Sequence, residues 1–271
     1  MNKELTTKAA LKAAILRMPG GAGLQRWWQR RHIHRAERRW GLPEIAQAFV
    51  AEYGWNVQQG PFAGMRYVRC GKGSNFVNKL LGAYESELHG ALALIGRTSY
   101  TSVVNIGCAE GYYAVGLARM LPAAQIYAFD LDPLPRRCCK ATAEANKVTD
   151  RVHIRCLCDH EQLQTLLKEG RPLVVSDCEG CEHELLNPTI VSVLARADIL
   201  VELHDCGNTP RLEAFLASFT ATHQVERIYR EERNTADYPS LNVFHPEQRI
   251  IAAKEYRDSN QQWAFLTAKG S

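Results

Sequence analysis

The sequence of 271 residues lacks the marks of a membrane, secreted or disordered protein. No window holds the roughly 18 uninterrupted apolar residues that a membrane-spanning helix needs. The apolar run Leu11–Leu16 is too short for a secretory signal, and Lys8 and Lys12 interrupt it. The hydrophobic fraction of 46% and the charged fraction of 23% are typical of globular chains, which excludes global disorder. We therefore expect a cytoplasmic protein of one large domain, or one domain with a small extra unit.

A full zinc or disulfide framework is missing as well. The chain has nine cysteines, an odd number in a chain that is not small, which argues against a disulfide framework. A structural zinc site usually needs two C-x-x-C pairs, and the sequence offers one, Cys178 and Cys181. This pair follows an expected strand, a context that also suits a redox pair. The simpler expectation is reduced, partly buried thiols.

Positive charge is concentrated at one end of the chain. Residues 1–40 contain ten Lys/Arg and two Asp/Glu, a net charge of +8, which leaves −4 for residues 41–271. Within this basic arm, Arg26-Trp27-Trp28-Gln29-Arg30-Arg31 interleaves arginines with tryptophans. Such a segment suits an anionic membrane surface, an anionic substrate or, less favourably, a nucleic acid. The simplest expectation is an amphipathic helix whose tryptophans pack on the domain.

From Thr101 onward, short β-branched runs alternate with helical stretches, a pattern typical of a parallel sheet wrapped by helices. The expected strands are Ser102–Ile106, Gln125–Phe129, Val152–Leu157, Leu173–Ser176, Ile199–Leu203, Val225–Tyr229 and Trp263–Thr267. The expected helices are Tyr112–Leu121, Pro135–Asn146, Glu161–Lys168, Glu182–Leu194 and Pro210–Phe219. Seven strands with intervening helices predict a doubly wound, mostly parallel α/β sheet.

The first hundred residues follow another pattern. Leu5–Met18, Leu24–Trp40 and Phe76–Leu94 have helical spacing, and Trp55–Tyr67 alternates like a hairpin around two glycine turns. There is no internal repeat and no low-complexity linker. We therefore predict a basic helical arm and cap over residues 1–95, packed on a ligand-binding domain over residues 96–271.

The end of the first expected strand carries a glycine loop, Gly107-Cys108-Ala109-Glu110-Gly111. Glycine at 107 permits a sharp turn and close approach of a ligand, and glycine at 111 allows the helix to pack on the sheet. The loop is neither G-x-G-x-x-G nor G-K-[ST], which favours a nucleoside without a pyrophosphate. Asp130, about 20 residues further on, suits the two ribose hydroxyls. Asp159, after the third strand, suits the amino group of an adenine.

The runs N-I-G-C-A-E-G-Y-Y and Y-A-F-D-L-D-P resemble the first two motifs of Rossmann-like methyltransferases that use S-adenosylmethionine (SAM). Within them the chain is most similar to the FkbM-type family, whose members mostly methylate hydroxyls of sugars and natural products. Three further runs support this: Gly82-Ala83-Tyr84-Glu85, Asp177-Cys178-Glu179-Gly180-Cys181-Glu182 and Val201-Glu202-Leu203-His204. The resemblance covers roughly residues 80–205. It departs at Asn105, where the family usually has an acid.

The resemblance implies SAM as cofactor. We expect the cofactor contacts at Asn105, Gly107, Cys108, Ala109, Gly111, Tyr112, Asp130, Leu131, Asp159 and Asp177. Tyr84 and Glu85, just before the first strand, are expected to touch the methionine end of the cofactor or the acceptor. Helix packing is the alternative role for both.

Asp177, Glu179, His204 and Asp205 follow the fourth and fifth expected strands and are the candidates for catalysis. A hydroxyl acceptor must lose its proton, which suits His204 or a carboxylate as general base. Alternatively, Asp177, His204 and Asp205 hold a divalent cation that lowers the pKa of the acceptor. Other roles stay open. Asp177 could bind the cofactor, Glu179 could cap the next helix, and His204 could be a strand-end histidine whose hydrogen bonds are satisfied within the protein.

The sequence thus predicts a SAM-dependent methyltransferase acting on a hydroxyl of a small molecule or glycan precursor. A homo-oligomer is compatible with this prediction. The nearest alternative is an RNA methyltransferase that docks through the basic arm. A non-catalytic SAM-binding or scaffold protein is the alternative that Asn105 raises.

Overall fold

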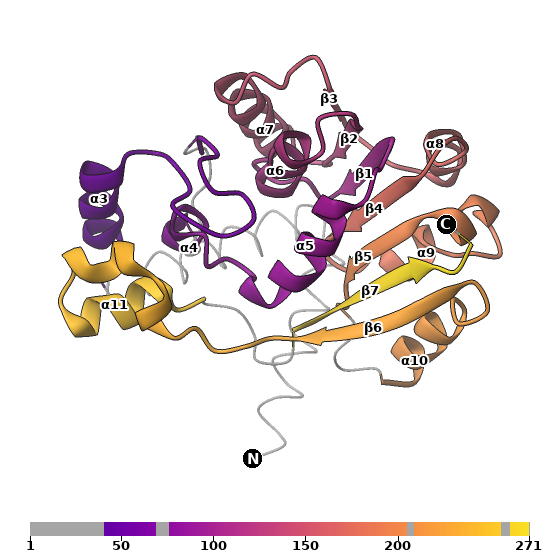
Figure 1. The fold of residues 1–271 in the computed structure, drawn as a ribbon. Coiled ribbons are helices and arrows are strands. Elements are labelled where there is room, and N and C mark those ends of the chain that lie inside the picture. The colour runs from indigo at the N-terminus through magenta and orange to yellow at the C-terminus, as the bar shows by residue number, and fades with distance from the viewer. Residues whose placement is uncertain (1–40, 69–75, 205–208, 256–260, 271) are drawn as a thin grey trace, which may run out of the picture.

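A computed structural model describes residues 41–68, 76–204, 209–255 and 261–270, which form one seven-stranded sheet (Figure 1). The strands are β1 (Ser102–Ile106), β2 (Gln125–Phe129), β3 (Val152–Arg155), β4 (Pro172–Ser176), β5 (Asp198–Glu202), β6 (His223–Tyr229) and β7 (Gln262–Ala268). Their order is β3-β2-β1-β4-β5-β7-β6. The first five strands are parallel, and β7 runs antiparallel to both β5 and β6. The predicted doubly wound, mostly parallel sheet is confirmed.

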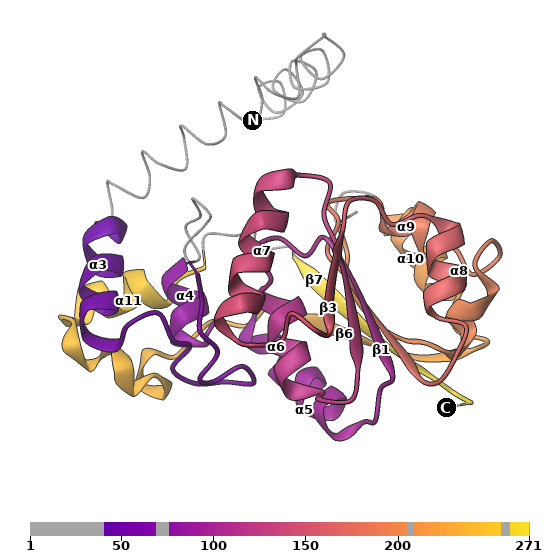
Figure 2. The same ribbon diagram turned by 90° about the horizontal axis from the view of Figure 1, so that it is seen from above.

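Helices cover both faces of this sheet (Figure 2). On one side lie α5 (His89–Arg97), α6 (Tyr112–Met120) and α7 (Pro133–Ala145), and on the other α8 (His160–Leu166), α9 (Glu182–Leu185) and α10 (Thr209–Ala217). The central strands β1, β4 and β5 are buried along their whole length. Each face of the sheet has its own hydrophobic core, and alternate residues of a strand enter opposite cores. In β1, Val103 packs in one core and Val104 in the other. This explains why these strands are continuous apolar runs rather than alternating ones.

Two of the expected helices are interrupted in the structure. The segment Glu182–Leu194 does not form a single helix, because α9 ends at Leu185 and a separate 3₁₀ helix, η2, spans Ser192–Arg196. Pro188 stands between them. Proline disfavours the helical conformation of the preceding residue, here Asn187, so the helical spacing is interrupted there.

The cap begins with α3 (Leu42–Tyr53), followed by a short hairpin held by the isolated bridge Asn56↔Arg66. The expected helix Phe76–Leu94 is instead split into α4 (Phe76–Leu81), the 3₁₀ helix η1 (Ser86–Leu88) and α5. The break falls at Gly82, whose φ is +80° and whose missing Cβ would lie 2.0 Å from the carbonyl oxygen of Gln59. Glycine is needed there because the hairpin backbone touches it.

The connection between β6 and β7 adds to the same cap. It contains η3 (Thr235–Asp237), η4 (Pro239–Val243) and α11 (Pro246–Ala253), and α11 packs on α3 and α4 (Figure 1). The sequence pattern did not predict this part. Chain segments far apart in sequence therefore build one cap, while the division at residues 95 and 96 stays a prediction.

The expected helices Leu5–Met18 and Leu24–Trp40, and with them the basic arm, lie outside the described residues. Among the helices that are described, none has the length and apolar character to cross a membrane.

Candidate functional site

The glycine loop joins β1 to α6 at the carboxyl edge of the sheet, beside the loop that follows β4. Gly107 has a φ of +78°, and a Cβ on it would lie 1.7 Å from the carbonyl oxygen of Asp177. Gly111 has a φ of +90°, and its Cβ would lie 2.9 Å from Sγ of Cys139 in α7. The sequence predicts that Gly111 lets α6 pack on the sheet. That partner is wrong, because this glycine lets α6 approach α7. Both glycines are required by close contact as well as by backbone conformation.

Asp130 braces this loop from the end of β2. Its Oδ2 accepts a hydrogen bond from the backbone N–H of Ala109 at 3.0 Å, and its Oδ1 accepts one from Asp132 at 2.9 Å. Ala109 has a φ of +45°, a conformation that is unfavourable for a residue with a side chain. Leu131, the next residue, is 69% exposed. The predicted ribose acid thus lies against the predicted cofactor loop, with an apolar side chain open to solvent beside it.

Asp159 is exposed and caps α8, since its Oδ1 accepts a hydrogen bond from the backbone N–H of Gln162 at 2.8 Å. A helix cap of this kind is sufficient to explain an aspartate at that position. The adenine contact of Asp159 stays a prediction.

Asn105 is 1% exposed and faces the same core as Val103 and Val175. Its amide N–H donates to the carbonyl oxygen of Val175 at 3.3 Å. Its Oδ1 is buried and has no hydrogen-bond partner among the described residues. A buried acceptor without a donor is unfavourable, so this oxygen has the capacity for a further hydrogen bond, and the cofactor contact of Asn105 stays a prediction.

An aromatic layer from the cap covers the start of α6. Tyr112 is buried, and its ring lies edge-on to that of Tyr84 at 5.3 Å between centroids. Lys79 of α4 lies 4.7 Å from the centroid of Tyr84 and 2.7 Å from Oε1 of Glu110 in the glycine loop. Burial opposes ionisation of Glu110, but Lys79 and the hydroxyl of Tyr67 lower its pKa to about 2. The side chains of Cys108 and Tyr112 are both buried, and their contacts with the cofactor stay predictions.

His204, two residues after β5, lies at the centre of a carboxylate cluster. Its Nδ1 is 2.8 Å from Oε1 of Glu182. Its Nε2 is 3.3 Å from Glu202, 3.5 Å from Asp177 and 3.8 Å from Glu179. Burial alone would lower the pKa of His204, but Glu182 and the other carboxylates raise it. The sequence prediction that Asp177, Glu179 and His204 come together is met by this geometry.

Two members of the cluster were not predicted as site residues. Glu202 is 1% exposed, and its burial, together with the neighbouring Asp177, raises its pKa well above the usual range of a carboxyl. Glu182 is also 1% exposed, and its Oε1 lies 2.8 Å from Nδ1 of His204. An ionisable residue at the end of an otherwise apolar strand was the signal for Glu202. Asp205 lies outside the described residues.

The loop from Asp177 to Glu182 is closed by a disulfide between Cys178 and Cys181. The expectation of reduced thiols at these positions is therefore wrong. Glu182 reaches back over the loop, with Oε1 accepting from the N–H of Cys178 at 2.9 Å and Oε2 accepting from that of Gly180 at 3.0 Å. The carboxylate that positions His204 is thus itself positioned by the disulfide loop.

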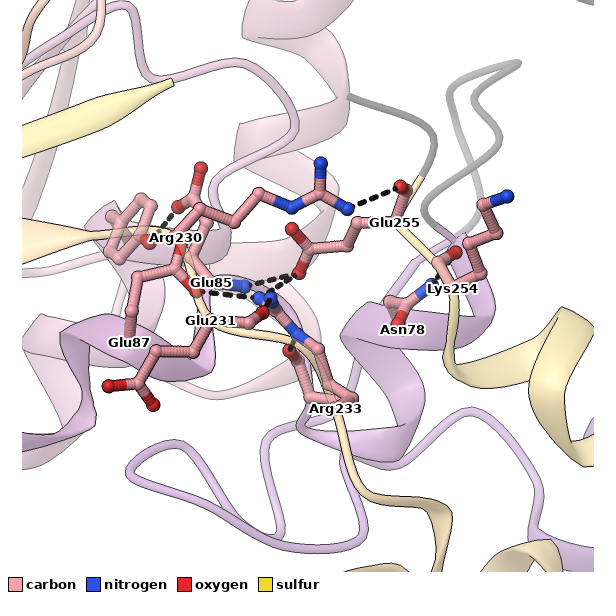
Figure 3. Close-up of polar contacts among 10 residues, drawn as sticks. Asn78, Glu85, Glu87, Arg230, Glu231, Arg233, Lys254 and Glu255 are labelled. Carbon is pink, nitrogen blue, oxygen red and sulfur yellow. Dashed lines mark hydrogen bonds and ion pairs between the residues drawn. The ribbon is translucent and has the colours of Figure 1, made fainter. Parts of the chain in front are cut away.

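Glu85 belongs to a buried polar network between the cap and the sheet (Figure 3). Its side chain is fully buried and accepts a hydrogen bond from the hydroxyl of Tyr113, and its backbone N–H donates to Oε1 of Glu255 at 2.6 Å. Arg233 pairs with Glu255 at 2.6 Å and with Glu87 at 2.7 Å. The carboxylate of Glu85 is therefore committed to the fold in this structure, and its contact with an acceptor stays a prediction, as does that of Tyr84.

Taken together, these residues form two adjoining groups at one edge of the sheet. The loops after β1 and β2 meet through Ala109 and Asp130, and the loops after β4 and β5 meet through Asp177 and His204. Asp177 joins the groups, because its N–H donates to the carbonyl oxygen of Ile106 at 2.9 Å. In an open α/β sheet, this edge between β1 and β4 is where the strand order reverses and ligands bind.

No family model matches the chain, and no curated protein sequence matches it. Among solved structures it is similar to precorrin-6y C5,15-methyltransferase from Geobacter metallireducens GS-15, at 14% identity over 69% of this chain and 88% of the other, with a TM-score of 0.45. It is also similar to an rRNA methylase from Streptococcus thermophilus, at 12% identity over 67% and 96% of the chains, with a TM-score of 0.46. A putative O-methyltransferase from Klebsiella pneumoniae matches at 15% identity over 60% and 77%, with a TM-score of 0.40. Likeness this low defines no activity or acceptor for this chain.

The class of fold rests on the sheet itself. A seven-stranded sheet of this order, parallel except at β7 and flanked by helices on both faces, is the Rossmann-like methyltransferase fold.

Proposed function

We propose that this protein is a SAM-dependent methyltransferase that acts on a hydroxyl group of a sugar, a glycan precursor or a natural-product small molecule. The observation that carries the proposal is the junction at the carboxyl edge of β1 and β4. There the loop from Gly107 to Gly111, braced by Asp130, adjoins a histidine surrounded by carboxylates. A nucleoside-type loop and an acid–base group at one edge of a sheet are what transfer of a methyl group to a hydroxyl requires.

The residues present fit this cofactor. Within the described part of the chain, the buried Oδ1 of Asn105 has no donor, which suits the ammonium group of a methionine moiety. Each carboxylate oxygen of Asp130 accepts one backbone hydrogen bond and keeps a second acceptor site for a ribose hydroxyl. The exposed Leu131 offers an apolar surface for a base at the same edge. When bound, SAM supplies an electrophilic methyl group on its sulfonium.

His204 is proposed as the general base. Because Nδ1 lies 2.8 Å from the buried carboxylate of Glu182, Nε2 is the nitrogen that takes the proton of the acceptor hydroxyl. The carboxylates of Asp177 and Glu179 lie near that nitrogen and stabilise the imidazolium that forms. Positioning of the acceptor supplies the rest of the rate.

A divalent cation is the alternative use of the same side chains. One ligand atom from each of Asp177, Glu179 and His204 lies within 4.8 Å of the others. The contact of Glu182 with Nδ1 is the carboxylate partner that ligating histidines usually have. Titration with a chelator separates the two mechanisms: a general base keeps its activity, whereas a metal site loses activity and regains it with added cation.

Calorimetry tests the cofactor. The full chain should bind S-adenosylhomocysteine with a Kd of about micromolar order and should show no binding of NAD. Methyl transfer from labelled SAM to a panel of sugar and small-molecule hydroxyls then tests the reaction. Tight binding of NAD without a signal from S-adenosylhomocysteine would contradict the proposal.

A further inference from the structure

The disulfide between Cys178 and Cys181 lies inside the carboxylate cluster. Asp177 directly precedes the ring that the disulfide closes, Glu179 lies within it, and Glu182 directly follows it. All three side chains have oxygens within 4 Å of His204. The bond therefore controls the segment that supplies most of the charge around the histidine.

The ring also fixes an unusual backbone. Glu179 has a φ of +60° and Gly180 a φ of +110°, which presents the N–H groups of Cys178 and Gly180 to the carboxylate of Glu182. A left-handed conformation at a glutamate is unfavourable and persists only where its surroundings impose it. Without the covalent link, Glu179 is free to leave this conformation, and Glu182 then loses the donors that orient it toward Nδ1 of His204.

The bond is accessible to a reductant and adds little to global stability. Cys181 is exposed, Cys178 is half-buried, and Gly180 between them is exposed as well. A disulfide that closes so short a segment removes little entropy from the unfolded chain. Exposed disulfides are also the ones that exchange readily with external thiols.

We propose that Cys178 and Cys181 form a reversible redox couple that switches the His204 cluster, active as the disulfide and inactive as the dithiol. The change in activity rests on the proposed function, whereas the redox couple itself does not. The reductant is a dithiol. Its thiolate attacks Sγ of Cys181, the bond between Cys178 and Cys181 breaks, and the leaving Sγ of Cys178 takes a proton. The second thiol of the reductant then displaces Cys181 as a thiol and leaves as a cyclic disulfide, for a total transfer of two electrons and two protons.

The test uses the full chain, equilibrated with mixtures of reduced and oxidised dithiothreitol. Alkylation with mass spectrometry counts the thiols at both positions, and circular dichroism reports the fold. We expect reduction without unfolding and an exchange rate of the Cys178 and Gly180 amide hydrogens faster by about tenfold or more. Turnover should fall by about tenfold or more and return on reoxidation, because the base loses its orientation.

The double variant Cys178→Ser, Cys181→Ser should keep the low turnover of the reduced enzyme under every redox condition. Cys156→Ser, at an exposed free cysteine, is the matched control and should respond as the unmodified chain does. Reduction that occurs only on unfolding, or that leaves both amide hydrogens unchanged, overturns the redox couple. Absence of methyl transfer in both redox states contradicts the proposed function instead, while the thiol and exchange measurements still decide the couple.

Discussion

At the scale of single residues, Gly107 shows why the glycine loop has its sequence. Its Cβ position is occupied by the backbone of the loop after β4, which cannot move as a side chain would. We expect Gly107→Ala to destabilise the protein by about 2–4 kcal/mol, from overpacking and a strained φ. Urea unfolding measures this. Gly90→Ala is the control, since a Cβ at that position in α5 would meet no described atom within 4 Å beyond its chain neighbours and the helix backbone, and alanine favours a helix. Equal stability of the two variants would contradict the argument.

His204 leads to a prediction about pH. A general base works as the neutral imidazole, and the neighbouring carboxylates raise the pKa of His204. Turnover should therefore fall as the pH drops through that raised pKa. Glu182→Gln removes the charge closest to Nδ1, so the pKa of His204 falls and the acid limb of the kcat profile moves to lower pH. An acid limb that stays in place would show that His204 does not set it.

At the scale of helices and strands, periodicity located the sheet well and the helix ends less well. The strands β1 and β2 match their predicted bounds, because continuous β-branched runs between turn residues are an unambiguous signal. The breaks at Gly82 and Pro188 were missed because the apolar spacing continues across both. The connection between β6 and β7 was missed for another reason: its short helices are fixed by tertiary contacts with α3 and α4.

The sequence predicted some of the site residues and missed others. Asp177, Glu179 and His204 could be placed together because parallel strands end at one edge. Glu182 was assigned to a helix start, and nothing in its spacing shows that a disulfide turns the chain back toward His204. Pairing of cysteines and the fold of a loop depend on distances that a linear pattern does not contain.

The network that joins the β6–β7 connection to the cap should make stability depend on pH. Burial raises the pKa of Glu255 to about 7, although Arg233 lies beside it. From about pH 4.5 to 7 the folded protein keeps a proton that the unfolded chain releases, so the free energy of unfolding falls as pH rises through this window, by up to about 3 kcal/mol. Glu255→Gln should reduce this dependence by that amount, as measured by urea unfolding across that range. Glu226→Gln, at an exposed position of β6, should retain it.

At the scale of the whole molecule, the basic arm separates two kinds of acceptor. If residues 1–40 pack on the domain, their deletion should lower thermal stability or solubility and leave RNA binding absent in both forms. If the arm docks RNA, the intact chain should bind RNA with a steep dependence on salt, and the deletion should abolish that binding. We expect the first result. Replacing Arg26, Arg30 and Arg31 by glutamine is the control for charge alone, and salt-sensitive, arm-dependent binding at physiological ionic strength would favour an RNA methyltransferase.

The two halves of the site make the final prediction, because they lie on opposite sides of the β1–β4 junction. Asp130 contacts the glycine loop, whereas His204 contacts only the cluster after β4 and β5 among the interactions described above. Asp130→Ala should weaken binding of S-adenosylhomocysteine by about 1–3 kcal/mol through lost hydrogen bonds, and should also loosen Ala109. His204→Ala should leave that affinity nearly unchanged and lower turnover by about 10²-fold or more. Calorimetry and single-turnover methyl transfer on the same variants separate binding from chemistry. If His204→Ala keeps full turnover on the acceptor, the histidine is structural, and the chemistry must then lie elsewhere along this edge of the sheet.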